Sequence, residues 1–257
     1  MRVMRRAFLI AGIAAALLSL LGAVAMADTL IGTNASEQLQ GTPGPDQIYG
    51  EAGDDTLLGL GGNDYLEAGP GDDQIDAGGG LDLVIAGTGD DHVDGGVGDD
   101  VVYAGAGDDV VLGGAGDDTL FGQDGSDRLF GGSGEDRIYA SLGQDFVDAG
   151  SDDDTVFADG SGITILAGGG DDTVSATGGP TTVEGGGGND RIRTGAGNDH
   201  VSGGPGRDSL ATGAGDDRIE AADGRRDRVR CGPGNDSVTA DRIDLLSGCE
   251  NVTRPIG

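Results

Sequence analysis

The sequence contains no tryptophan and no lysine, and its only aromatic residues are four tyrosines and five phenylalanines among 257 residues. So few large side chains cannot build the deep apolar core of an ordinary globular domain. Glycine, by contrast, occurs 55 times, and it loses more backbone entropy on ordering than any other residue. Composition alone would therefore indicate a low-complexity or disordered chain.

Positive charge is also scarce. Fifteen arginines oppose 46 acidic residues, which gives a formal net charge of −31. This balance excludes ordinary nucleic-acid binding, which requires a basic surface. The excess of carboxylates points instead to cations as partners.

Only one long hydrophobic run is present, from residue 7 to about residue 25, and three arginines precede it. It ends at Ala25-Met26-Ala27, which has the small-x-small form of a signal-peptidase site. We therefore interpret residues 1–27 as a signal peptide and expect a secreted, extracellular protein. A permanent membrane anchor is less favoured because the run is rich in alanine and glycine, so we expect no membrane span after cleavage.

The export route stays open, because "RRAFL" at residues 5–9 also resembles a twin-arginine signal. We favour the general secretory route, which carries unfolded chains. Removal of the three N-terminal arginines would leave 46 acidic residues against 12 arginines, a net charge of −34.

An acidic residue recurs every ninth position over most of the chain. Steps of nine from Asp55 reach Asp46 and Glu37 backward and Asp217 forward, with misses only at Ile163 and Thr181. An aliphatic residue stands two positions after every step, giving twenty-one registered units. Such regularity identifies a repeat architecture.

Each unit reads G1-G2-x3-G4-x5-D6-x7-U8-x9, where U is aliphatic, as in "GGAGDDTLF" at residues 113–121. This pattern resembles the RTX, or haemolysin-type, calcium-binding nonapeptide repeat, and the resemblance extends over roughly residues 32–239. It implies an all-β, right-handed parallel β-roll. Because nine is odd and a strand has period two, one inward U8 per unit predicts a short strand and a six-residue turn. Two units then form one 18-residue coil with two parallel sheets.

Stacked coils lie about 4.8 Å apart, which places the acidic turns directly over one another. The resulting repulsion requires counterions. Calcium accepts carboxylate and carbonyl oxygens in flexible geometry, whereas the turns offer no histidine, cysteine or methionine for transition metals. The alternative is a solvated acidic surface, which the fixed register and the glycine frame disfavour.

We therefore predict that the position-6 aspartates bind multiple Ca²⁺ ions. The predicted ligands are Asp46, Asp55, Asp64, Asp73, Asp82, Asp91, Asp100, Asp109, Asp118, Asp127, Asp136, Asp145, Asp154, Asp172, Asp190, Asp199, Asp208, Asp217 and Asp236. Pairs that stand two units apart, and so stack in successive coils, number nine on one edge and six on the other, so the upper bound is fifteen ions. The position-5 acids are less certain ligands, because Asn63, Leu81 and Arg207 occupy the same position; we expect them to tune charge.

Ile163 and Thr181 are two units apart and so stack on one edge. We predict a calcium-free gap there, between Asp145 and Asp199, and favour sequence drift over a special site.

Residues beside U8 face outward. At position 9, steps of two units predict an exposed stripe on one sheet, formed by Ile85, Tyr103, Phe121, Tyr139 and Phe157. This stripe could serve self-association or a surface partner, or it could be a self-stabilising aromatic ladder. His92 and His200 are expected to face solvent rather than act in catalysis.

The register slips by one residue after Asp217, so we divide the mature chain into a β-roll at 28–220 and a C-terminal cap at 221–257. Cys231 and Cys249 are separated by the length of two units, and one coil of offset brings them within disulfide reach. Four apolar residues are expected to cover the last core layer: Ile243, Leu245, Leu246 and Val252.

No catalytic module accompanies the repeats: the chain has no G-x-S-x-G, no H-E-x-x-H and no P-loop. We therefore expect a non-enzymatic, secreted calcium-binding protein. The alternative is an adhesion or matrix protein that uses the stripe, with calcium serving only the scaffold. An enzyme site on the roll itself would need convergent reactive groups outside the repeat, and we find none.

Overall fold

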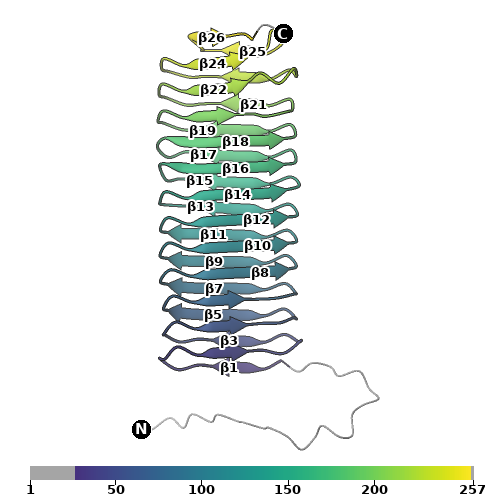
Figure 1. Ribbon diagram of the computed structural model, residues 1–257, viewed down its shortest axis with the longest axis vertical. Helices are drawn as coiled ribbons and strands as arrows, with labels where there is room; N and C mark the ends of the chain where they lie inside the picture. Colours follow the sequence, from purple (N-terminus) through teal and green to yellow (C-terminus); the bar gives the residue numbers. More distant parts are fainter. Residues whose placement is uncertain (1–26, 256–257) are drawn as a thin grey trace, which may run out of the picture.

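The computed structural model describes residues 27–255 as a single rod built from two parallel β-sheets. Successive strands alternate between the sheets, so the chain winds upward from β1 near one end to β26 at the other (Figure 1). Each sheet has thirteen strands. The predicted parallel β-roll is confirmed. Among the described residues, no helix has both the length and the apolar character needed to cross a bilayer; the predicted signal peptide lies outside them apart from Ala27.

The strands are short and evenly spaced. The first sheet contains β1 (Thr29–Ile31), β3 (Gln47–Tyr49), β5 (Tyr65–Pro70), β7 (Leu83–Thr88), β9 (Val101–Ala106), β11 (Thr119–Asp124), β13 (Arg137–Ala140), β15 (Thr155–Ala158), β17 (Thr173–Ala176), β19 (Arg191–Thr194), β21 (Ser209–Ala211), β23 (Arg228–Arg230) and β25 (Leu245–Ser247). The second contains β2 (Gln38–Gln40), β4 (Thr56–Leu58), β6 (Gln74–Asp76), β8 (His92–Val97), β10 (Val110–Ala115), β12 (Arg128–Ser133), β14 (Phe146–Ser151), β16 (Ile163–Gly169), β18 (Thr181–Gly187), β20 (His200–Ser202), β22 (Arg218–Ala221), β24 (Ser237–Ala240) and β26 (Asn251–Thr253).

Strand pairing follows the sequence period. Val102 pairs with Leu120, which stands two repeat units later. Near the C-terminus the step is longer by a single residue, as Leu210 pairs with Val229. The inserted residue is thus absorbed in a turn, and the sheet register continues.

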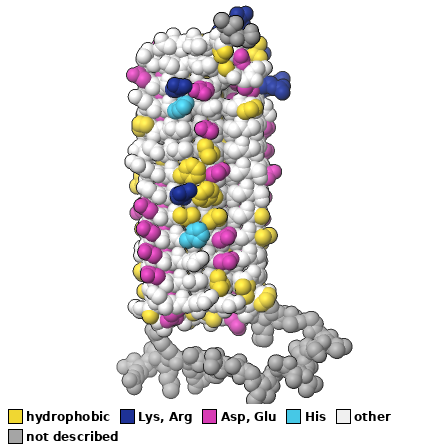
Figure 2. Space-filling view, in the orientation of Figure 1, with side chains coloured by type: hydrophobic (Ala, Val, Ile, Leu, Met, Phe, Trp, Pro, Cys, Tyr) yellow, Lys and Arg dark blue, Asp and Glu magenta, His cyan; other side chains and the backbone are white. Residues whose placement is uncertain are grey.

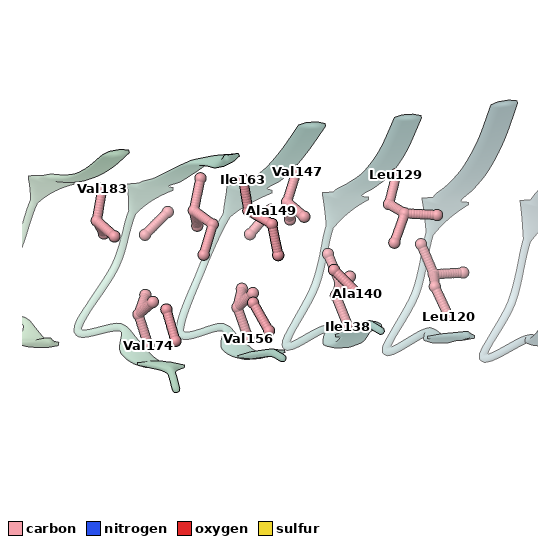
Figure 3. Close-up of a cluster of buried hydrophobic side chains, with 14 of the residues drawn as sticks. Leu120, Leu129, Ile138, Ala140, Val147, Ala149, Val156, Ile163, Val174 and Val183 are labelled. Carbon is pink, nitrogen blue, oxygen red and sulfur yellow. The ribbon is translucent and has the colours of Figure 1, made fainter. Parts of the chain in front are cut away.

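The core is a narrow ladder of position-8 side chains. From Ile48 to Ile219, every one of them is at most 1% exposed. Figure 3 shows Leu129 and Val147 of one sheet pointing toward Leu120 and Ile138 of the other. Position 1 also faces inward, and many of its residues are buried alanines, which add a second small layer that the period did not predict.

Many units contain two glycines whose backbone conformations disfavour a side chain. Gly105 (position 2) and Gly107 (position 4) have φ of +121° and +143°. A Cβ at Gly107 would also overlap the carbonyl of Gly89 in the preceding coil. Gly107 therefore serves both the turn and the close stacking of coils. Non-glycine residues adopt positive φ at the equivalent positions of a few other units, which are Glu51, Leu60 and Gln123 at position 2 and Asp152 at position 4.

The C-terminal segment differs partly from expectation. A disulfide joins Cys231 and Cys249, whose Cα atoms are 5.2 Å apart. Of the four predicted covering residues, Leu246 packs against the core, but the cap prediction was wrong for Ile243, Leu245 and Val252, which are 51%, 45% and 41% exposed. The reasons differ. Leu245 is an end residue of β25, where only the middle side chain points inward. Ile243 lies in the turn before that strand, and Val252, which is in register with Val238, belongs to the last strand of its sheet, so no further described strand covers it.

Substitution of Gly107 by alanine is expected to destabilise the rod, by about 1–3 kcal/mol for backbone strain alone, with a further steric contribution. Gly187→Ala is the matched control, because nothing lies within 4 Å of its Cβ position and its φ is not positive. Thermal unfolding in calcium would measure both variants. Equal melting temperatures would contradict the stacking described above.

Candidate metal centre

The position-6 aspartates form the most unusual feature of the rod, because they are charged residues in its interior. Each one sits in a turn immediately before a strand, and all nineteen predicted ligands are at most 3% exposed. Aspartate is almost never so buried unless it is paired or binds a metal. The structure therefore places the predicted ligands together in two stacks, one on each edge.

One carboxylate oxygen of each aspartate has a defined partner. The backbone N–H of Asp46 donates to Oδ1 of Asp64 at 2.7 Å, and that of Asp100 donates to Oδ1 of Asp118 at 2.8 Å. The acceptor always lies one coil further toward the C-terminus. These bonds tie successive turns together along both edges.

The other oxygen has no partner. For every predicted ligand except Asp46, Oδ2 is buried and accepts no hydrogen bond. The Oδ2 atom of Asp46 accepts from the backbone N–H of Thr42. A buried anionic oxygen without a donor is strongly unfavourable and calls for an ion.

At several turns, a backbone carbonyl oxygen of the next coil lies near the orphaned atom. An ideal Cβ on Gly113 would lie 2.5 Å from Oδ2 of Asp118 and 2.7 Å from the carbonyl oxygen of Gly131 in the next coil. The carbonyl of Gly107 accepts no hydrogen bond among the described residues and points at Gly125 one coil later. Carboxylate and carbonyl oxygens from adjacent coils therefore lie close together at several of the turns.

This donor set fits calcium. Ca²⁺ takes six to eight oxygen ligands, including backbone carbonyls, in flexible geometry. Within residues 27–255, no three carboxylate, imidazole or thiol side chains gather as a metal-binding group. A site here would draw its ligands from carboxylate and backbone carbonyl oxygens, the hard donors that calcium prefers.

Burial also changes the acid–base behaviour of these aspartates. Desolvation raises the pKa of Asp64 to about 6, although the hydrogen bond from the Asp46 backbone lowers it in part. The same cause raises the pKa of Asp91 to about 7 and that of Asp154 to about 8, and neighbouring carboxylates raise both further. Without a cation, the interior carboxylates resist ionisation.

The position-5 residues have a structural role that the sequence did not indicate. The backbone N–H of Asp72 donates to Oδ1 of Asp54 at 3.1 Å, so this bond runs in the opposite direction along the chain from the position-6 bonds. The side chains are exposed, and Asn63 accepts from Leu81 in the same way. An amide or hydroxyl oxygen can serve as well as a carboxylate, as Asn63 and Ser36 do, whereas Leu81 and Arg207 have no side-chain acceptor.

Sequence reasoning missed Asp227 as a candidate ligand. It is 1% exposed, its Oδ2 has no partner, and its Oδ1 accepts from the Asp208 backbone at 2.9 Å. Because one residue is inserted before it, a nine-residue step from Asp217 does not reach Asp227. The aliphatic Val229 two positions later could have identified it, since every position-6 residue is followed by an aliphatic residue at that distance. Asp244 and Glu250 accept equivalent bonds from Asp227 and Asp236.

The two missing positions are occupied by side chains that cannot bind calcium in this way. Ile163 and Thr181 point inward and are 1% and 4% exposed. They begin β16 and β18, so strand structure replaces part of the turn. No position-6 carboxylate stands between Asp145 and Asp199 on this edge, and the calcium-free gap remains a prediction.

The outward aromatic stripe is a stack of parallel rings. The ring centroids of Tyr103 and Phe121 are 4.6 Å apart with an interplanar angle of 3°, and stacking continues through Tyr139 to Phe157. Phe157, at the end of the stack, is 39% exposed, whereas Ile85 and the other three rings are partly buried. Mutual stacking favours the ladder interpretation, because each ring covers its neighbour's face.

The two histidines (cyan in Figure 2) lie on the surface, as predicted for His92 and His200. Nε2 of His200 lies 3.7 Å from a carboxylate oxygen of Glu220, an exposed pair on the second sheet.

Comparison with known proteins agrees with this geometry. The family model of the RTX calcium-binding nonapeptide repeat matches eight segments that together cover residues 31–156 and 164–226. The chain belongs to the RTX calcium-binding repeat family. The unmatched residues 157–163 fall at the turn where this RTX chain has Ile163 in place of aspartate.

A solved structure shows the same fold. The chain is similar to a hyperactive, Ca²⁺-dependent, β-helical antifreeze protein from an Antarctic bacterium, with a TM-score of 0.62 and 23% identity. The match covers 86% of this chain and 83% of that one. No curated protein matches. At this identity the likeness extends to the RTX β-roll alone.

The raised pKa values predict how pH affects the metal-free rod. Folded aspartates hold protons more tightly than unfolded ones, so the stability of the metal-free rod is greatest at low pH. It falls as pH rises from about 4 through the folded pKa values of about 6 to 8. Circular dichroism in chelator should therefore show more ordered structure at pH 5 than at pH 8. In calcium, which binds deprotonated carboxylates, the protein should instead be more ordered at pH 8 than at pH 5. A metal-free protein with more ordered structure at pH 8 than at pH 5 would contradict the interpretation.

Asp109→Asn and Asp108→Asn test the ligand assignment with the same change of charge at adjacent positions. Asp109 is buried with an orphaned Oδ2, whereas Asp108 is exposed and accepts a backbone bond from Ser126. We expect Asp109→Asn to remove one or two ions from the calorimetric stoichiometry and Asp108→Asn to remove none. If both variants lost the same number of bound ions, the distinction between positions 5 and 6 would be contradicted.

Proposed function

We propose that this protein is a secreted, non-enzymatic calcium-binding protein whose β-roll folds when multiple Ca²⁺ ions occupy its turns. One observation carries the proposal: on both edges of the rod, buried carboxylates present an oxygen that no protein donor satisfies. The family supplies the identity of the cation.

The ions would act as part of the core. The position-8 ladder is only one side chain deep on each sheet, and it cannot by itself offset the repulsion between stacked carboxylates. Fifteen ions, the upper bound from the sequence, would bring 30 positive charges against a net charge of −34 for the chain without residues 1–27. The stacked pairs Asp208–Asp227 and Asp217–Asp236 would add further sites.

Binding would couple to folding and hence to location. Metal sites that do not exist in the unfolded chain contribute their binding free energy to folding. Because calcium is scarce inside cells and abundant outside, the chain would stay extended until exported. This supports secretion through the general secretory route, in which residues 1–27 serve as the signal peptide.

The absence of enzymatic activity is supported by the chemistry of the buried groups. In the described part of the chain, the buried titratable side chains are repeat aspartates, and both histidines are exposed. A nucleophile with an adjacent base is the usual requirement for covalent catalysis. Adhesion through the aromatic stripe is less supported, because the rings are stacked on one another.

Calcium titration of the demetallated protein at pH 7.5 tests the proposal. Circular dichroism should change from an unfolded to a β-rich spectrum on adding calcium and return on adding chelator, with calorimetry reporting more than ten ions per chain. Magnesium at the same concentration is the control and should fold the chain far less well, because it demands a stricter octahedral geometry. A spectrum that chelator leaves unchanged would refute the proposal.

A further inference from the structure

Charge is distributed unevenly along the rod. Residues 28–190 contain 35 acidic residues and two arginines, whereas residues 191–257 contain 11 acidic residues and ten arginines. The first segment therefore carries a net charge of −33 and the second −1. The C-terminal third is the one part of the rod where positive charge is concentrated.

Most of these arginine side chains have no partner among the described residues. All ten are exposed. Among the described residues, only Arg218 forms an ion pair, with Glu220 at 2.8 Å, although acidic residues are abundant. Arg254 donates instead to the backbone carbonyl of Asp241. Exposed arginines that lack an ion-pair partner can attract a carboxylate of another molecule.

Two of these arginines belong to a regular column. On the edge that precedes the first sheet, position 5 of five successive coils is occupied by Asp153, Asp171, Asn189, Arg207 and Arg226. From the N-terminal to the C-terminal end of the column, the first two side chains are negative, the third is neutral and the last two are positive. Hydrogen bonds between successive coils hold the column in register. In each, a backbone N–H donates to the side-chain Oδ1 of the residue one coil earlier, at 2.7–3.1 Å: Asp171 to Asp153, Asn189 to Asp171, and Arg207 to Asn189.

We propose that this column is a self-recognition surface, on which a second copy of the chain docks antiparallel about a two-fold axis at Asn189. In this arrangement Arg207 faces Asp171 of the second copy and Arg226 faces Asp153, while the two Asn189 residues meet at the axis. A two-fold interface requires such a self-complementary pattern, in which residue i contacts j and j contacts i.

The geometry favours a second copy over an unrelated polyanion. Both columns repeat at the coil spacing of about 4.8 Å, so every guanidinium can meet a carboxylate in register. The Oδ1 atoms of Asp153 and Asp171 accept backbone bonds, which orients the carboxylates and leaves Oδ2 for the guanidinium. The opposite edge has no arginine at position 5; its residues include Asp54, Asp72, Asp90 and Asp108.

The proposed dimer requires a folded rod. It rests on the proposed calcium function only because bound calcium would lower the repulsion between two acidic rods. Exposed ion pairs are weak one by one and are screened by salt. The dimer should therefore form at low ionic strength, where the Debye length is about 30 Å at 0.01 M, and dissociate near 1 M, where it is about 3 Å.

Sedimentation velocity in saturating calcium tests the pairing, with circular dichroism confirming that each variant is folded. Arg207→Asp/Arg226→Asp should be monomeric at low salt; it installs the residue most common at position 5, so the rod should fold. Asp153→Arg/Asp171→Arg should also be monomeric alone. An equimolar mixture of the two double variants should recover the dimer, and so should the chain carrying all four substitutions.

Arg193→Asp/Arg230→Asp is the matched control, because it makes the same change of charge on exposed residues of the sheet face and should stay dimeric. A wild-type chain that is folded yet monomeric at low salt overturns the proposal, as does a folded four-substitution chain that fails to dimerise. A monomer that binds heparin through Arg207 and Arg226 would also overturn it and assign the arginines to a foreign polyanion. Failure to fold with calcium would count against the proposed function instead.

Discussion

The stacking of the rod depends on the position-6 carboxylates, in which one oxygen accepts a hydrogen bond and the other generally does not. Each predicted position-6 ligand lies inside the turn, where one oxygen accepts a backbone N–H from the preceding coil and, in every case except Asp46, the other has no donor. The first interaction stacks the coils, and the second makes the stack unfavourable for an anion. Under the proposed function, a cation shared between turns would resolve both demands; without one, the carboxylates would have to be protonated, as the upward pKa shifts indicate. Metal binding and folding would then be coupled in this chain.

The remaining features follow from bringing turns so close together. Glycines at positions 2 and 4 let the backbone adopt positive φ and let carbonyls approach the next coil, as Gly107 does over Gly89. The position-5 oxygen accepts the neighbouring N–H from the opposite direction, so each turn is tied both upward and downward. On the sheet face, the stacked rings from Tyr103 to Phe157 repeat the same axial spacing. A one-dimensional stack of this kind tolerates a local defect, such as the pair Ile163 and Thr181, because each coil contacts only its neighbours.

Much of this was predictable because a nine-residue period leaves little choice of fold. The period predicted the strands, the inward ladder from Ile48 to Ile219 and the buried aspartates. It did not predict the position-5 hydrogen bonds, because a mixed column of Asp, Asn and Ser looks like simple charge variation. It missed Asp227, since one inserted residue lengthens the step from Asp208. It also failed for Ile243, because this residue directly precedes Asp244 in a turn, where the position-5 side chains of the other coils are exposed.

The charge pattern adds a second level of organisation to the same repeat. Acidic turns would hold cations inside the rod, while the exposed residues of one edge change sign between Asp171 and Arg207. The most direct measurement of the central claim is a crystal structure grown in calcium, with anomalous difference density collected for the metal. We expect peaks along both edges within about 2.3–2.6 Å of the Asp Oδ2 atoms, the range of Ca–O distances. On the edge that carries Ile163 and Thr181, the row of peaks should be interrupted between Asp145 and Asp199. Ordered turns without such peaks, with Oδ2 bonded to water or protonated, would contradict the claim.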